Sequence, residues 1–399
     1  MSSIQSNGPW ARTLPAAMLL LAPFNILASL AMDIYLPAVP RMPAILGTTP
    51  AVVQLTLTVY LVVLGLGQLL FGPVSDRVGR RPVLFCGALV FAGASFALAA
   101  TTSAVPFVCL RLLQAAGASA ALVALFATVR DVYAGDAQST VVYGLLNGML
   151  ACVPALGPLA GAFLIAVQGW QAIFVLLGVL ATLQALHAWP RWRETRPPYT
   201  RHRRAGFGAM VRSPSFRTCT LGFSAAMGTF FVFFSTAPRV LIDRAGYGEL
   251  RFSLAFSTVA LVMIATSWLA KRHIRRWGTA GSLARGMALL LVGAAALAAG
   301  ELWFAPSFAS FVLPMWVMAT GIALAVSVTA NGALAGFDDV AGRAVALHFC
   351  LQSLVTGVVG TGCVVLLDGA TAWPLVTFAS AMAVVILLLL QRRPVASPS

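Results

Sequence analysis

The sequence predicts an all-α polytopic membrane protein with twelve transmembrane helices in two pseudo-symmetric six-helix halves. Three observations lead to this fold class. Of the 399 residues, 60% are hydrophobic and only 9% are charged, whereas soluble domains carry about 25% charged residues. Apolar runs of about 20 residues, the length that crosses a bilayer as a helix, recur twelve times. A basic stretch after the sixth run divides the chain into six runs and six runs.

The twelve predicted spans follow one another along the whole chain. They are residues 14–35, 52–71, 82–100, 104–129, 141–165, 170–189, 216–238, 252–270, 282–300, 306–334, 343–367 and 371–390. We therefore predict an N-terminal half (1–189), a basic cytoplasmic linker (190–215) and a C-terminal half (216–399). Two such halves imply a substrate site at their interface.

The positive charge of the chain is distributed as in a membrane protein. Its formal net charge is +15, but the lysines and arginines cluster in short connections after even-numbered runs and in the linker. This bias predicts that both termini are cytoplasmic, and it argues against nucleic acid as a partner. We expect the lipid bilayer and a small molecule as partners of a monomer. The six cysteines show no metal-ligand spacing, so we expect no metal.

Two charged residues lie inside apolar runs. Asp33 ends the first run, where only Asn25 and Ser29 are polar between Leu14 and Ala31. A buried acid costs ~2.5–3.5 kcal/mol on insertion scales unless it faces water or a partner. Asp33 either reaches headgroup water at the helix end or is a protonatable group that faces a cavity. Arg111 lies within the fourth run, seven or more positions from the nearest polar loop, which makes snorkelling a poor explanation.

The connection after the second run combines glycines, an acid and paired arginines. One interpretation is an ordinary basic connector. The full pattern is more specific, and it resembles the hallmark loop between helices 2 and 3 of the major facilitator superfamily. The resemblance implies that this loop latches the halves on the cytoplasmic side. Its gating residues are Gly72, Asp76, Arg77, Gly79, Arg80 and Arg81. Residues 271–278 are a weaker echo that lacks the aspartate.

Two further segments resemble motifs of the same superfamily. Arg111-x-x-Gln114 resembles the helix-4 motif, which is implied to link proton binding to substrate, although Ala115 replaces the usual glycine. Gly157-Pro158-x-x-Gly161 resembles the antiporter motif of helix 5. That motif is implied to separate drug exporters from importers, and Ala162 is a small departure from it.

The stretch from Asp33 to Pro40 resembles the helix-1 motif of twelve-helix drug:proton antiporters. Residues 126–133, 227–238 and 331–338 resemble the phenicol exporters of that family. The resemblance implies proton-coupled efflux of chloramphenicol, and of florfenicol as a further substrate, across the bacterial inner membrane by alternating access, which confers antibiotic resistance. Protons are the coupling ion, and no cofactor is expected. Multidrug relatives place a second acid at about the position of Asn25, and an asparagine cannot titrate. Asp33 would therefore be the carboxylate that carries the coupling, together with Arg111.

Phenicols are uncharged molecules with a ring, hydroxyls and an amide, so they suit an apolar, aromatic pocket with a few hydrogen-bonding groups. For any single phenylalanine, helix or lipid packing is the alternative interpretation. The candidate substrate-binding residues are Asn25, Tyr35, Gln54, Tyr60, Gln114, Met149, Met227, Phe230, Phe231 and Phe234.

Other functions remain as alternatives. A broader multidrug:proton antiporter and a proton-coupled importer both fit the same fold. A membrane enzyme needs a nucleophile–base pair, an HExxH motif or a metal cluster within the helices, and the sequence contains none of these, so we do not expect an enzyme. A channel needs a filter made by repeated loops, and no such repeat occurs.

Overall fold

The computed structural model describes residues 14–133, 138–196, 207–337 and 340–392, so residues 197–206 of the predicted linker lie outside it. The elements in this part of the chain are all helical. Twelve of its helices are long and apolar enough to cross a membrane, which confirms the predicted number. They are Leu14–Ile45, Pro50–Val78, Arg80–Ala100, Ala104–Val132, Val141–Gln168, Gln171–Ala188, Pro214–Arg244, Glu249–Leu269, Lys271–Trp303, Phe308–Leu334, Ala341–Leu366 and Trp373–Gln391.

Several helices extend beyond their predicted ends. The connection after the second run was expected to be a loop from Gly72 to Arg81, but α3 (Pro50–Val78) continues through it and α4 begins at Arg80. Only Gly79 is non-helical, with φ +119°, a conformation that favours glycine. Asp76 and Arg80, four residues apart, form an ion pair across this short turn. Gly72 therefore lies inside a helix and makes no turn.

The ninth helix also begins early. α11 (Lys271–Trp303) includes the basic echo and breaks once, at Gly278, where φ is +65° and ψ is −175°. Gly79 and Gly278 thus both provide a left-handed turn before an apolar helix. The turn at Gly79 and the segment at Gly278 are therefore similar in backbone conformation, as predicted. The second segment has no counterpart of Asp76.

The chain forms two compact units. Unit 1 comprises residues 1–35 and 59–202, and unit 2 comprises residues 36–58 and 203–399. Residues 36–58 thus group with the C-terminal part of the chain, and the predicted division at residues 190–215 stays a prediction. Three polar contacts attach this segment within unit 2: Arg41 pairs with Glu249, Gln54 bonds Ser235, and the Thr58 and Thr361 hydroxyls bond each other.

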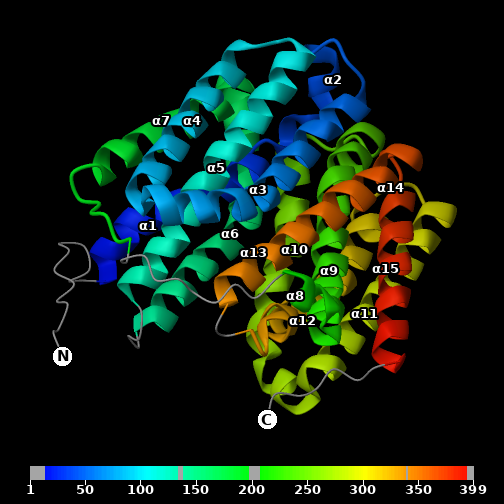
Figure 1. Cartoon of the computed structure of the whole chain (residues 1–399). Coiled ribbons are helices and arrows are strands. Elements are labelled where there is room, and N and C mark those ends of the chain that lie inside the picture. Colours follow the sequence, from blue (N-terminus) through cyan, green and yellow to red (C-terminus); the bar gives the residue numbers. More distant parts are fainter. Residues whose placement is uncertain (1–13, 134–137, 197–206, 338–339, 393–399) are drawn as a thin grey trace. The chain divides into compact units, whose positions relative to one another are not determined.

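Unit 1 is organised around α4 (Arg80–Ala100) and α5 (Ala104–Val132), which pack against α1 (Leu14–Asp33) and α7 (Gln171–Ala188) (Figure 1). The two central helices approach most closely at Gly87 and Gly117. A Cβ atom on Gly87 would lie 2.7 Å from the Gly117 carbonyl oxygen. Small residues at such crossings allow backbones to pack tightly in lipid, where no hydrophobic force joins helices.

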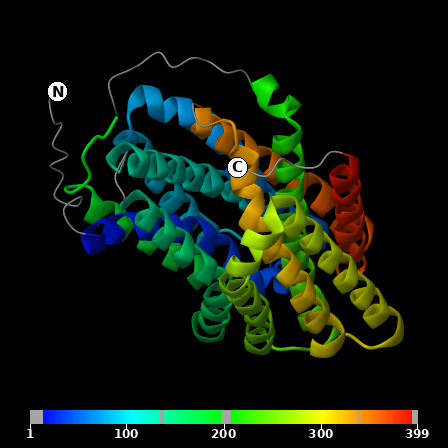
Figure 2. The ribbon, with the colours of Figure 1, turned by 90° about the horizontal axis from the view of Figure 1, so that it is seen from below.

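Unit 2 repeats this arrangement with α11 and α12 (Leu313–Leu334). A Cβ atom on Gly286 would lie 2.7 Å from the Gly321 carbonyl oxygen, as in the matching pair of unit 1. α9 (Pro214–Pro238), α10 (Glu249–Leu269) and α15 (Trp373–Arg392) complete the packing, and Figures 1 and 2 show α15, in red, beside α11, in yellow.

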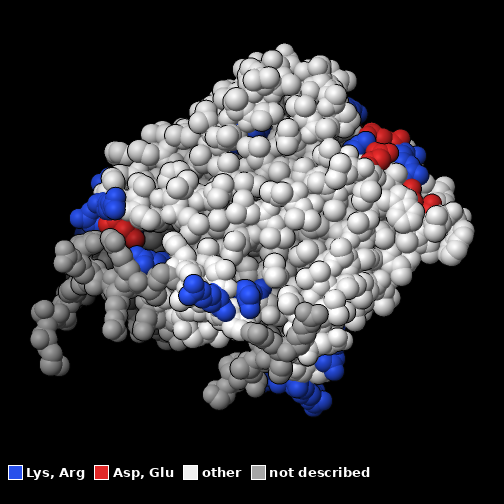
Figure 3. Space-filling view, turned by 45° about the vertical axis from the view of Figure 1, so that its right-hand side comes forward, with Lys and Arg blue, Asp and Glu red and all other residues white. Residues whose placement is uncertain are grey.

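The remaining elements of unit 2 are short or interrupted. The eleventh span is α13 (Ala341–Leu354), the π-helical turn η5 (Val355–Gly360) and α14 (Thr361–Leu366). The shorter elements are η1 (Leu36–Arg41), α2 (Met42–Ile45), α8 (Phe207–Arg212), η2 (Arg239–Arg244) and η3 (Phe308–Val312). The first and last residues of η2 form ion pairs: Arg239 with Asp368 and Arg244 with Glu301. Figure 3 shows one mixed group of acidic and basic side chains at the upper right of the view, and further charged side chains, mostly Lys and Arg, at the left and along the lower side.

Candidate functional site

Asp33 is the last residue of α1 and is buried, with 5% of its surface exposed. Its burial disfavours the interpretation that the carboxylate simply reaches water at the helix end. The Ser29 hydroxyl, one turn earlier on the same helix, donates to Asp33 Oδ2 at 3.2 Å. The sequence alone did not single out Ser29 as a partner, although its spacing of four residues from Asp33 was the available signal.

The end of α1 rests on two glycines of α6 (Gln138–Gln168). A Cβ atom on Gly157 would lie 2.8 Å from the Cβ of Asp33, and one on Gly161 would overlap the carbonyl oxygen of Ile34. Pro158 lies between them within the helix. The Gly-Pro-x-x-Gly segment therefore gives the carboxylate-bearing turn room to pack directly on the α6 backbone.

Arg111, on α5, is fully buried. Its Nη1 donates to the Ala31 carbonyl oxygen at 3.1 Å and to Gln114 Oε1 at 2.7 Å. Gln114 in turn donates from Nε2 to the Ser95 hydroxyl at 2.8 Å. The predicted residues Arg111 and Gln114 are thus hydrogen-bonded to each other. Ser95 on α4 extends the network, and it was not predicted from the sequence.

Aromatic rings surround the Arg111 guanidinium. Its central carbon lies 4.6 Å from the ring centre of Tyr60 and 5.1 Å from that of Tyr35. Phe174 on α7 stands at 6.0 Å, within reach of a cation–π interaction. The Tyr60 hydroxyl donates to the Ala28 carbonyl oxygen at 2.6 Å, so this ring is fixed to α1. A buried charge of this kind needs such partners.

Asp33 and Arg111 do not form an ion pair in the described part of the chain; they are linked through the last turn of α1, where Arg111 bonds Ala31. The Nε and Nη2 groups of Arg111 have no hydrogen-bond partner among the described residues. Buried charged donors without partners are costly. This arrangement can therefore bind an additional acceptor, whether a carboxylate or a polar group of a bound molecule.

The other predicted substrate-binding residues are spread over both units. In unit 1, Asn25 donates from Nδ2 to the Leu146 carbonyl oxygen at 3.0 Å, and Met149 packs at the edge of the hydrophobic core. In unit 2, Phe230 and Phe234 on α9 contact Phe256, with ring centres 6.1 and 6.0 Å apart. The remaining two on α9 are Met227, which is half-buried, and Phe231, which is buried against Gly360.

Among the predicted gating residues of unit 1, Asp76, Arg80 and Arg81 take part in a polar network centred on Arg80, which is 2% exposed. Its guanidinium donates to Asp76 at 2.6 Å and to Asp131 at 2.9 Å. Arg81 donates to the Trp189 carbonyl oxygen at 3.1 Å and lies 5.0 Å from the Trp189 ring centre. Charge-assisted bonds of this kind are the strong ones, so the connection is rigidly held.

Glu194 completes this network and was missed from the sequence. Its carboxylate accepts hydrogen bonds from the backbone N–H groups of Arg80, at 2.8 Å, and Arg81, at 3.2 Å, at the start of α4. A Cβ atom on Gly79 would overlap it. Partial burial raises the pKa of Glu194, but hydrogen bonds from four backbone N–H groups outweigh it, so the pKa lies below its ordinary value. Through Glu194, the start of the predicted linker is therefore bonded to the turn between α3 and α4.

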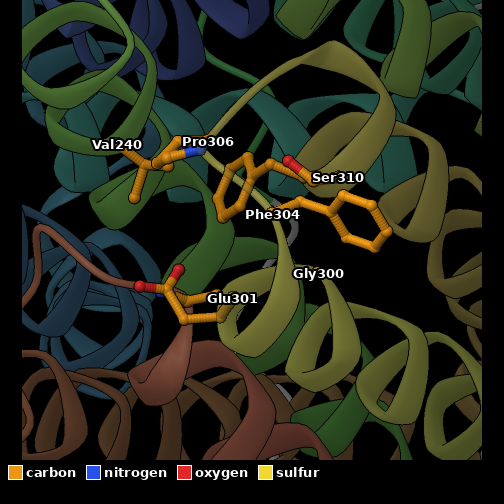
Figure 4. A pocket seen from close by; sticks show the side chains of 8 residues that line it. Val240, Gly300, Glu301, Phe304, Pro306 and Ser310 are labelled. Carbon is orange, nitrogen blue, oxygen red and sulfur yellow. The ribbon is translucent and has the colours of Figure 1, made fainter.

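The described residues of unit 2 line a small cavity and a large one. The smaller, lined by Glu301, Ser310 and Val240 among others (Figure 4), has a volume of about 10 Å³, room for about one water molecule. The Glu301 carboxylate there accepts from Arg244 and from the Ala372 backbone N–H. The larger has a volume of about 460 Å³ and is lined by residues 39–54 together with parts of α9, η2 and α14, including the predicted Gln54.

Comparison with known proteins identifies relatives over nearly the whole chain. The family model of the Major Facilitator Superfamily matches residues 21–361. A "Chloramphenicol resistance protein" of Pseudomonas aeruginosa is 50% identical over 386 residues, which cover 96% of this chain and 91% of that protein. A "Multidrug resistance protein MdtL" of Klebsiella pneumoniae is 28% identical over 255 residues, covering 63% of each chain.

Solved structures share the fold at low sequence identity. A bacterial homologue of the human lysosomal transporter Spinster covers 96% of this chain and 95% of its own, with a TM-score of 0.68 and 15% identity. A POT family transporter solved with 5-aminolevulinic acid covers 94% and 96%, with a TM-score of 0.72 and 13% identity. These likenesses support the all-helical transporter fold.

Proposed function

The chain belongs to the major facilitator superfamily, and we propose that it exports phenicol antibiotics such as chloramphenicol in exchange for protons, which confers resistance. The observation that carries the substrate class is the 50% identity, over 96% of the chain, to a protein named for chloramphenicol resistance. The observation that carries the coupling is the carboxylate of Asp33, buried at the end of α1, to which the Arg111 network is bonded.

The chemistry of this site suits proton exchange. An ionised carboxylate in a dry interior is unfavourable unless it is compensated, so Asp33 prefers to hold a proton while its surroundings are closed. Loss of that proton creates an acceptor on the same helix end that Arg111 bonds through Ala31, and Nε and Nη2 of Arg111 have no partner among the described residues. Binding of drug and binding of proton then favour different conformations, which is the thermodynamic requirement for exchange.

Arg111 transmits the change because it is bonded to α1. Its bond to Ala31 and the bond of Tyr60 to Ala28 hold two positions of α1 that are less than one helical turn apart. A movement of Arg111 toward a charged Asp33 breaks the first of these bonds. The last turn of α1 packs on Gly157 and Gly161, so a change there also reaches α6.

The setting of the transporter is part of the proposal. The distribution of lysine and arginine supports cytoplasmic termini, and we propose a bacterial inner membrane as the location. We further propose that the protein acts as a monomer, uses protons and no cofactor, and transports its substrate without modifying it chemically.

The test is drug susceptibility of cells that express the wild type, Asp33→Asn or Arg111→Ala at matched levels. The proposal expects chloramphenicol resistance from the wild type and its loss in both variants, because each removes one part of the coupling site. Full resistance in Asp33→Asn would place proton coupling elsewhere. No resistance from the wild type would contradict the substrate.

A broader multidrug antiporter is the second candidate, favoured by the 28% identity to a multidrug resistance protein. The same cells, challenged with structurally unrelated cationic and neutral drugs, distinguish the two. Resistance confined to phenicols supports the first proposal, and resistance to several unrelated classes supports the second.

A further inference from the structure

The larger cavity of unit 2 has the composition of a binding site, and we call it the proline-walled cavity. Pro40, Pro43 and Pro50 line it, together with valines and a leucine from α3 and α14. Its volume of about 460 Å³ falls within the ~300–1,000 Å³ of small-molecule sites. Asp33 and Arg111 are not among its lining residues, so it is separate from the coupling site.

A buried polar pair lies in this apolar lining. Gln54 is 5% exposed and Ser235 is 1% exposed, and Gln54 Nε2 donates to Ser235 Oγ at 3.0 Å. A carboxamide offers an acceptor oxygen and a second N–H, and the serine still has its own O–H to donate. The described residues supply no further partner to either side chain. The pair therefore presents both donors and acceptors to a ligand.

The charged residues of the cavity select against ions. Arg239 donates to Asp368 at 3.3 Å, so these two neutralise each other. Asp243 adds one exposed carboxylate, which repels anions, and a single solvated charge attracts a cation only weakly. The ligand that fits is uncharged, with an apolar body and amide and hydroxyl groups.

We infer that the proline-walled cavity is a second drug site, which binds the uncharged, amide-bearing and hydroxyl-bearing molecules to which phenicols belong. The inference rests on the proposed function for the identity of the drug. The segments that line it are η1, the start of α3, η2 and the end of α14, and all of them adjoin connections between odd and even spans. The distribution of lysine and arginine indicates that these connections lie outside the cytoplasm. The cavity would therefore bind the drug on the side of the membrane where it is released.

Equilibrium dialysis of the purified full-length protein with radiolabelled chloramphenicol tests this inference. The wild type is expected to bind two molecules per chain. Removing both polar groups in Gln54→Ala/Ser235→Ala is expected to weaken one of the two sites at least tenfold, since each neutral hydrogen bond contributes up to about tenfold. Ala51→Trp, which puts a bulky ring at an exposed position of the lining, is expected to abolish the same site without removing a polar group.

Two controls make the result specific. Ser327→Ala removes the hydroxyl of an exposed serine of the same unit, which among the described residues bonds its own helix at the Ala323 carbonyl oxygen, and should leave both molecules bound. Arg111→Ala should retain the molecule in the proline-walled cavity.

The outcomes separate the two proposals. Binding by the wild type that is unchanged in both cavity variants overturns the second site and leaves phenicol export standing. Absence of any chloramphenicol binding by the wild type overturns the substrate itself. Melting temperatures of the variants, measured in parallel, identify loss of binding that comes from loss of folding.

Discussion

Substituting the glycines of α6 tests whether the carboxylate-bearing turn depends on close packing. In Gly157→Ala the new methyl group would lie 2.8 Å from the Cβ of Asp33, about 0.7 Å closer than the ~3.5 Å at which carbon atoms pack. In Gly161→Ala it would overlap the backbone oxygen of Ile34, which cannot rotate away. Overpacking of this kind costs about 1–3 kcal/mol, and we expect the last turn of α1 to move.

The same helix supplies the matched controls. Gly144 and Gly148 have the same spacing, but a Cβ atom on either would meet nothing within 4 Å. We expect Gly144→Ala and Gly148→Ala to keep wild-type chloramphenicol resistance, while Gly157→Ala reduces it and Gly161→Ala abolishes it. Resistance is measured at matched expression, and thermal unfolding of the purified variants reports the lost stability. Equal behaviour of Gly161→Ala and Gly148→Ala would refute the packing argument.

Three further predictions concern single side chains. Arg111→Lys should abolish export, because an ammonium group lacks the planar face that lies beside the Tyr35 and Tyr60 rings and lacks the Nε and Nη2 donors. Export at the wild-type rate in vesicles would show that charge alone suffices. Tyr60→Phe keeps the ring beside Arg111 but loses the bond to Ala28. The free energy of unfolding should therefore fall by about 1 kcal/mol, and some export should be retained. A Tyr60→Phe variant as inactive as Arg111→Lys would assign the hydroxyl a direct role in export. Glu194→Gln removes a carboxylate whose pKa is depressed below 4.5; its stabilisation is present above that pH and is lost as pH falls through the lower folded-state pKa. The melting temperature of the wild type should therefore exceed that of Glu194→Gln by a constant amount from about pH 7 to 5 and approach it below about pH 4, and a difference that grows on acidification would contradict the assignment.

The sequence was sufficient to predict the spans because hydropathy and length determine them directly. It failed at the connection after the second span for a physical reason. Glycine, proline and charged residues at 72–81 are typical of a loop, but the Asp76–Arg80 pair and the nearby Asp131 support a helix that continues to Val78. Only Gly79, whose backbone has a positive φ, behaves as the pattern predicts.

The candidate site was predicted in part. Charged and amide residues in apolar runs identified Asp33, Arg111 and Gln114, because burying them needs a partner. The partners themselves were mostly backbone oxygens, such as that of Ala31, and a small hydroxyl, Ser95. Backbone acceptors carry no sequence signal, and single serines are common in membrane helices, so no pattern could identify them.

The residues of the proline-walled cavity show the same limit. Gln54 was predicted as a polar residue in an apolar span, but its partner Ser235 lies 181 positions along the chain. Only tertiary packing brings the two together. Glu194 could not be identified from the sequence for the same reason, because it accepts hydrogen bonds from backbone N–H groups more than 100 residues earlier in the chain.

The central claim is that Asp33 couples drug export to proton movement. The most direct measurement uses proteoliposomes that contain the wild type or Asp33→Asn and a pH-sensitive dye in the lumen, to which a chloramphenicol gradient is applied. We predict that the drug gradient drives a pH change inside wild-type vesicles and none in Asp33→Asn vesicles. An equal pH change in both would contradict the claim.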